Sequence, residues 1–175
     1  MEDPRYPIGR FESVNRPLAP EERRARIEAI RALPADLRAA VAGLTDEQLD
    51  TPYRDGGWTV RQLVHHVVDS HVNAYVRFKL AATEDHPTVR AYDEKRWAEL
   101  PEAKTARVEV SLAFLEALHA RWVAFLDACG PGDFARTLHH PEIGDRALDF
   151  MLELYGWHGA HHTAHVTSLR ARRGW

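Results

Sequence analysis

Apolar residues recur three and four positions apart in four long stretches of the chain, the spacing that lines one face of an α-helix. The first stretch runs from about Pro20 to Gly43, and Pro34 inside it is expected to kink or restart the helix. A short helical turn is expected next, because Thr45 and Gln48 have the spacing of a capping box. This part of the chain therefore predicts one long helix followed by a brief one.

The remaining stretches predict three more long helices. One begins near Thr59, a favourable N-cap, and ends near Thr83. The next runs over residues 108–129 and is stopped by Gly130 and Pro131. The last runs over about residues 146–172, with basic residues in its final turn. No segment has the pattern of a confident strand.

Four amphipathic helices of this length, joined by shorter connections, predict an all-α, up-and-down four-helix bundle. We expect residues 1–175 to form one domain, in which residues 1–19 are an extended N-terminal segment because they are polar and contain several prolines. Bundles of this kind hold metal ions between the side chains of facing helices. The expected site is therefore a metal site between helices.

The composition narrows the range of partners. The net charge is −3 with neutral histidines, which gives no electrostatic basis for binding nucleic acid. No apolar run is long enough to cross a bilayer, and the chain begins with neither a signal nor a transit peptide, so we expect a cytoplasmic protein. The single cysteine, Cys129, excludes an intramolecular disulfide. The oligomeric state is left open, with a homodimer as one expectation. The unusual total is eleven histidines.

Several of these histidines lie in the segment "WHGAHHTAH" at 157–165, inside the last predicted helix. His161 and His165 are four residues apart, and so are His158 and His162, so each pair projects from one helix face. A pair with this spacing can supply two ligands to one metal ion. Taken alone, the spacing is equally consistent with solvated or singly hydrogen-bonded histidines.

A third ligand is available from "LVHHVVDSH" on the second long helix. His71 falls on the apolar stripe, which favours a core histidine with satisfied hydrogen bonds. His65 and His66 lie on opposite flanks of that stripe, because adjacent residues are about 100° apart on a helix. The flank of His66 indicates either the wall of a polar pocket or an ordinary solvated face. Its other polar residues are Ser70, Asn73 and Arg77.

Other metal and phosphate chemistries fit the sequence poorly. Zincin proteases need His-Glu-x-x-His, whereas His162 and Thr163 follow His161. Di-iron bundles need two Glu-x-x-His motifs, and the chain has one such spacing, from Glu116 to His119. The segment "RDGGW" is too short for a phosphate-binding loop.

Longer blocks of the chain resemble the YfiT-like branch of the DinB superfamily. They are "TPYRDGGWTVRQLVHHVVDSHVNAYVRFKL" at 51–80, "YPIGRF" at 6–11, "YDEKRW" at 92–97, "LHARW" at 118–122, and the C-terminal "WHGAHHTAH" with its "RRGW" ending. The resemblance runs nearly from end to end. The block at 51–80 is far more specific than the histidine spacing.

The resemblance implies a DinB-type bundle in which three histidines hold one divalent metal. One ligand is the second histidine of the His-His pair, and two come from an His-x-x-x-His pair on the last helix. Carried over, the ligands are His66, His161 and His165. Zinc or nickel is the expected metal, because an all-imidazole site favours metals that prefer nitrogen. The remaining site residues are then expected to line a pocket: Ser70, Asn73, Arg77, His158 and His162.

The resemblance points to a thiol S-transferase that conjugates bacillithiol, or a similar small thiol, to an electrophile. Three neutral imidazoles leave the metal its full charge and an open position, where a coordinating thiol loses its proton. Arg77, on the ligand flank, is expected to pair with a carboxylate of that thiol. The alternatives are a metal-dependent hydrolase that activates water and a metal-binding stress protein without turnover.

Overall fold

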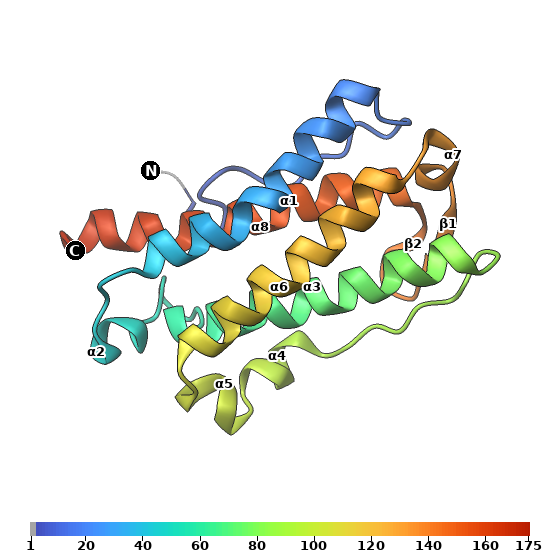
Figure 1. The fold of residues 1–175 in the computed structure, drawn as a ribbon. Coiled ribbons are helices and arrows are strands. Elements are labelled where there is room, and N and C mark those ends of the chain that lie inside the picture. The colour runs from blue at the N-terminus through green and yellow to red at the C-terminus, as the bar shows by residue number, and fades with distance from the viewer. Residues whose placement is uncertain (1–2) are drawn as a thin grey trace.

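The computed structural model describes residues 3–175, and its four long helices form a bundle (Figure 1). The prediction of an all-α four-helix bundle is confirmed, and each helix begins and ends within a few residues of its expected position. The four helices are α1 (Pro20–Val41), α3 (Val60–Thr83), α6 (Val108–Ala128) and α8 (Leu148–Arg173).

Short elements fill the connections between the long helices. Four are brief helices: α2 (Asp46–Leu49), α4 (Glu94–Ala98), α5 (Pro101–Thr105) and α7 (Pro131–Phe134). The other two are the strands β1 (Thr137–His140) and β2 (Gly144–Ala147), which pair antiparallel with Thr137 opposite Ala147. The sequence analysis did not predict this hairpin, because strands of four residues are too short to show a clear alternation of apolar and polar residues.

The order of the helices differs from a simple up-and-down bundle. α1 packs against α6 and α8, and α3 packs against the same two helices. Figure 1 shows that α3 and α6 run in one direction, whereas α1 and α8 run in the other. Two consecutive long helices can be parallel here because residues 84–107, which include α4 and α5, return along the bundle before α6 begins.

Local signals in the sequence account for the helix boundaries. Thr45 and Thr59 cap α2 and α3, and in both cases the hydroxyl accepts a hydrogen bond from the backbone N–H three residues later. Pro34 does not restart the first helix as expected, since α1 continues through it to Val41. The proline still removes one backbone donor, so the Ile30 carbonyl cannot accept the usual helical hydrogen bond from the residue four positions later.

The apolar core has two halves, one at each end of the bundle. The half near α7 includes Phe78, Trp122 and Leu152, and the half near α2 includes Leu37 and Leu63. A layer rich in histidine lies between them. On α8 its histidines fall between the apolar residues 148–155 and 166–169, whereas on α3 His71 lies between the two halves and His66 lies among the residues of the half near α2. Polar groups are therefore concentrated at the middle of the bundle.

The N-terminal segment is tied to α8 by hydrogen bonds over its described part, residues 3–19. The Ser13 hydroxyl donates to Glu153 at 2.7 Å, and the Leu18 backbone N–H donates to Asp149 at 3.1 Å. Asp149 also receives two hydrogen bonds of 2.7 Å from Arg23 on α1. Residues 1 and 2 of the expected extended segment lie outside the described residues. Over residues 3–175, every helix falls short of the length or apolar character that crossing a bilayer requires.

Candidate metal centre

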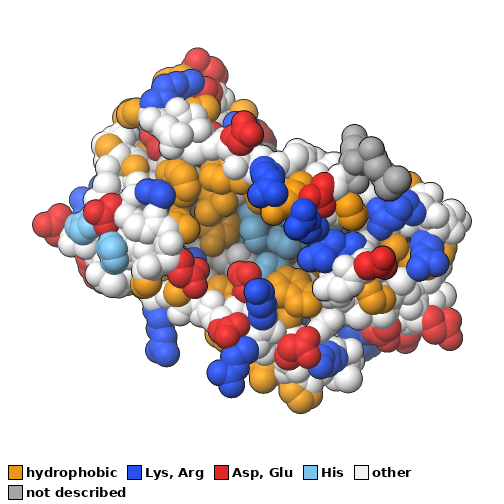
Figure 2. Space-filling model, turned by 180° about the vertical axis from the view of Figure 1, so that it is seen from behind, with side chains coloured by type: hydrophobic (Ala, Val, Ile, Leu, Met, Phe, Trp, Pro, Cys, Tyr) orange, Lys and Arg blue, Asp and Glu red, His pale blue; other side chains and the backbone are white. Residues whose placement is uncertain are grey.

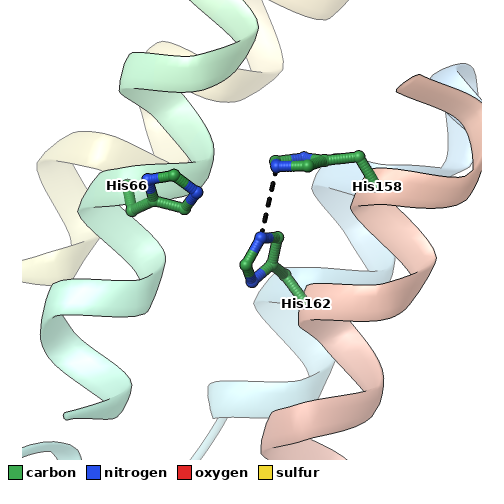
Figure 3. Close-up of side chains that lie close together, drawn as sticks. All are labelled: His66, His158 and His162. Atoms are coloured by element: carbon green, nitrogen blue, oxygen red, sulfur yellow. Dashed lines mark hydrogen bonds between the residues drawn. The ribbon is translucent and has the colours of Figure 1, made fainter. Parts of the chain in front are cut away.

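Three histidines from two facing helices meet at the middle of the bundle. His66 projects from α3, and His158 and His162 project from α8 (Figure 3). One ring nitrogen of each lies within 4.8 Å of the others. The centroid of the His66 ring is 5.6 Å from that of His158 and 4.9 Å from that of His162. The Nε2 atoms of His158 and His162 are 3.2 Å apart.

The structure groups His66 with a different pair of histidines from the one expected. The sequence analysis placed His161 and His165 with His66, but their rings lie outside the group that contains His66. Residues three apart differ by about 300° on a helix, so His161 and His165 lie about 60° around α8 from His158 and His162. The packing of α8 on α3 selects the His158–His162 face.

His161 and His165 occupy a neighbouring environment of aromatic side chains. The His161 ring stacks on Trp157 with centroids 4.3 Å apart, and the His165 ring lies 4.3 Å from that of Tyr53. Their Nε2 atoms are 3.2 Å from each other. Both pairs on α8 have the same spacing in the sequence, and only the position of His66 distinguishes them.

Burial keeps the three facing histidines uncharged at neutral pH. Loss of solvation lowers the pKa of His66 to about 4. It also places the pKa values of His158 and His162 well below the ordinary value, and the neighbouring histidines lower them further. A neutral imidazole has one nitrogen lone pair free for a metal ion. The site therefore offers three nitrogen ligands without a prior loss of protons.

The contacts among these rings fit a bound cation. Two Nε2 atoms 3.2 Å apart can share only one proton between them. The Nδ1 atom of His162 is buried, and within residues 3–175 it has no hydrogen-bond partner. Three neutral nitrogen donors match the ligand preference of zinc and of nickel, and an ion held by these residues could accept a further ligand.

A cavity of about 180 Å³ lies beside the candidate metal centre and is bordered by His158. The expected pocket residues Ser70 and Arg77 line it, whereas Asn73 does not and instead donates to the Asp69 carbonyl at 2.8 Å. The Arg77 guanidinium donates to the Arg90 carbonyl at 2.9 Å, and its Nε atom is buried with no partner among the residues described.

Other residues of this cavity were absent from the expected site because they come from segments without a chemical motif. Tyr92 lies in the segment just before α4, Glu94 is the first residue of α4, and His140 is on β1. Burial raises the pKa of Glu94 above its usual value. The cavity thus combines one guanidinium with a carboxyl group whose pKa is raised above its ordinary value.

The two other histidines of α3 have the positions that the helix pattern predicts. His71 is fully buried and hydrogen-bonded to His119 and His158, as expected of a satisfied core histidine. His65 points away from the metal centre. The Ser111 hydroxyl lies 2.8 Å from its Nδ1 atom, and its Nε2 atom contacts the Ala106 carbonyl at 3.2 Å.

One face of the molecule has a hollow that exposes histidine side chains. Figure 2 shows histidine side chains on the floor of a hollow in this face, with apolar side chains beside them and charged side chains around the rim. A small molecule can therefore approach from solvent.

Comparison with known proteins agrees with this architecture. Residues 29–166 match the DinB superfamily. The chain belongs to the DinB superfamily. A relative from Bacillus cereus is 54% identical over all of both chains and is named "Putative metal-dependent hydrolase", and one from Bacillus thuringiensis has the same identity, coverage and general name.

Solved structures of other proteins show a similar fold. YfiT from Bacillus subtilis is 48% identical, with a TM-score of 0.95 over 98% of each chain. It is described as "a probable metal-dependent hydrolase with an unusual four-helix bundle topology". TT2238, "a four-helix bundle protein", is 21% identical with a TM-score of 0.56 over 87% of this chain and 99% of its own, so it supports the fold alone.

Proposed function

We propose that this chain is a metal-dependent enzyme in which His66, His158 and His162 hold one divalent cation, zinc or nickel. The observation that supports this best is the meeting of three uncharged imidazoles, two of them buried and that of His158 partly buried, beside a polar cavity. A bound zinc or nickel ion supplies a Lewis acid that lowers the pKa of a coordinated water or thiol toward neutrality. The reaction that fits is attack by such a nucleophile on a small electrophile.

Hydrolysis is the reaction supported by the names of the relatives, which describe metal-dependent hydrolases. In this reaction the nucleophile is water, which must lose a proton as it attacks. Glu94 lines the cavity bordered by His158, and its raised pKa makes it a better proton acceptor than an ordinary glutamate. Under this proposal Glu94 serves as the general base.

Thiol transfer is the second candidate, and the composition of the cavity favours it. A thiol that donates its sulfur to the metal would place the rest of the molecule beside His158. Arg77 is 7% exposed and has one buried N–H without a partner in the described chain, so it can bind a carboxylate there. The co-substrate would be a small acidic thiol such as bacillithiol, with an electrophile as the acceptor.

Product analysis distinguishes the two reactions. The zinc-loaded or nickel-loaded protein is incubated with a reactive epoxide, with and without bacillithiol, and in parallel with glutathione. A diol product supports the hydrolase, and a thioether formed faster than without enzyme supports the transferase. Metal binding with neither product would contradict both and would support the stress-protein alternative.

Two variants assign the cavity residues to one reaction or the other. Glu94→Gln keeps the shape of the side chain but removes the base, so it should slow hydrolysis and leave thiol transfer largely intact. Arg77→Gln should raise the KM for an acidic thiol and leave the KM for cysteamine, which has no carboxylate, unchanged. Equal effects of Arg77→Gln on both thiols would contradict carboxylate recognition.

A further inference from the structure

A chain of hydrogen bonds joins all four long helices at the level of the histidine layer. The His119 Nδ1 atom lies 2.6 Å from the Ile30 carbonyl oxygen, which joins α6 to α1. The His71 Nδ1 atom lies 3.0 Å from His119 Nε2, which joins α3 to α6. The His158 Nδ1 atom lies 3.1 Å from His71 Nε2, which joins α8 to α3. The chain ends at a proposed ligand of the metal.

The direction of every hydrogen bond in this chain follows from its first member. A carbonyl oxygen only accepts, so His119 must carry its proton on Nδ1. His119 and His71 are buried and uncharged, so each has one protonated nitrogen and one that accepts. His71 therefore donates from Nδ1 to His119, and His158 donates from Nδ1 to His71. The Nε2 atom of His158 is left with a free lone pair.

The carbonyl at the start of the chain is available because of a proline. In a regular helix, the Ile30 carbonyl would accept from the backbone N–H of residue 34. That residue is Pro34, which has no N–H. A buried carbonyl without a partner is unfavourable, and His119 satisfies it from the neighbouring helix. The proline in α1 thus leaves the Ile30 carbonyl without a competing backbone donor, so that it can accept from His119.

We infer that Pro34, His119 and His71 are positioning residues that fix His158 in the Nδ1-protonated form and so direct its Nε2 lone pair at the metal. This inference rests on the proposed role of His158 as a ligand. None of the three residues belongs to the group formed by His66, His158 and His162. Histidine ligands are commonly held in this way by a hydrogen bond to their second nitrogen, and losing that partner weakens metal binding.

The decisive test reads the protonated nitrogen of each ring directly. Full-length protein labelled with ¹⁵N-histidine is stripped of metal with EDTA, and long-range ¹H–¹⁵N spectra are recorded. We expect His71, His119 and His158 all to be protonated on Nδ1. A spectrum with His71 or His119 protonated on Nε2 would overturn the inference. This experiment needs no metal, so its outcome is independent of the proposed function.

Zinc affinity, measured by competition with a chromophoric chelator, tests the consequence for the ligand. His119→Leu removes both hydrogen bonds of the ring, and we expect zinc affinity to fall by about 10–100-fold. His119→Gln retains a donor and an acceptor, so it should recover most of the affinity. His65→Leu is the matched control, because His65 is also buried but is hydrogen-bonded to Ser111 and Ala106, and the zinc affinity of this variant should equal that of the wild type.

The results separate positioning from simple damage to the core. Equal zinc affinities for His119→Leu and the wild type would overturn the inference, as would equal losses in His119→Leu and His65→Leu. If wild-type protein binds no zinc while its rings show the expected protonation, the proposed metal site fails but the hydrogen-bond chain stands.

Pro34→Ala keeps the test open if His119→Leu does not fold. The substitution restores a backbone N–H that competes for the Ile30 carbonyl, and alanine is the better helix former. We expect a more stable protein that binds zinc several-fold more weakly, a combination that partial unfolding cannot produce. Unchanged zinc affinity together with unchanged His119 signals would show that Pro34 has no such role and would overturn the inference.

Discussion

The Nε2 atom of His158 lies 3.2 Å from the Nε2 atom of His162, and both face His66 across the interface of α3 and α8. This contact brings together polar groups in a part of the bundle where each is removed from water. It is favourable only if a proton or a cation lies between the two nitrogens. The burial of these two nitrogens is therefore unfavourable for folding in the absence of a cation, and the same two nitrogens are the ones available to bind a cation.

The buried histidines should make the stability of the metal-free protein depend on pH. His66 has a pKa of about 4 in the folded protein, below the value of 6.5 for an exposed histidine. The unfolded chain therefore binds a proton below pH 6.5 that the folded chain does not, so stability is lost as pH falls from 6.5 toward 4. His66 alone should cost about 2 kcal/mol between pH 6.5 and 5.

Urea unfolding of EDTA-treated protein, followed by circular dichroism at several pH values, measures this loss. The His66→Leu variant should show a shallower dependence on pH than the wild type, because it lacks one of the groups that take up protons on unfolding. A free energy of unfolding that is constant from pH 7 to 5 would contradict the burial of uncharged histidines.

Gly159 allows α8 to approach α1 closely, and this approach helps to set the position of the histidines on either side. A Cβ atom added at Gly159 would lie 2.5 Å from Leu33 Cδ2, far inside van der Waals contact. Alanine is the better helix former by about 1 kcal/mol, yet the clash should dominate. We expect Gly159→Ala to destabilise the protein by about 1–3 kcal/mol.

Chemical denaturation of Gly159→Ala and of a control measures this effect. Gly132→Ala is the control, because Gly132 is also helical but a Cβ atom there would meet no atom within 4 Å, so its stability should be unchanged or slightly higher. Combining Gly159→Ala with Leu33→Ala should give a loss smaller than the sum of the two single losses. Full additivity of the two would argue against the contact.

The adjacent histidines of α3 should differ sharply in their effect on metal binding. His66→Ala removes one of three proposed ligands and should weaken zinc binding severely. His65→Ala removes hydrogen bonds to Ser111 and Ala106, so it should lower the free energy of unfolding by about 1–3 kcal/mol and leave zinc affinity intact. Isothermal titration of both variants tests this, and the reverse pattern would rule out the assignment of His66.

Much of the fold could be predicted because a long helix on the surface of a core has apolar residues three and four positions apart. The caps Thr45 and Thr59 and the stop at Gly130 mark boundaries that the structure reproduces closely. The order of the helices could not be predicted, because nothing in the periodicity of residues 84–107 indicates that this segment returns along the bundle. The direction of α6 depends on that return.

The site was predicted in part, for a similar reason. Helix geometry separated His66 from His65, since the two lie on different flanks of one stripe. It could not choose between two histidine pairs with identical spacing on α8. That choice depends on the rotation of α8 against α3, which is set by packing such as the contact of Gly159 with Leu33. Glu94 and His140 reach the cavity from separate segments and had no signal in the sequence.

The most direct test of the proposed centre is a zinc titration of four alanine variants side by side: His158→Ala, His162→Ala, His161→Ala and His165→Ala. The four replace the same residue type on one helix, so the cost of substituting a histidine is matched across them. We predict that His158→Ala and His162→Ala lose most of the zinc affinity, while His161→Ala and His165→Ala bind one zinc ion nearly as tightly as the wild type. Loss of binding in His161→Ala and His165→Ala with retention in the other two would contradict the centre described here.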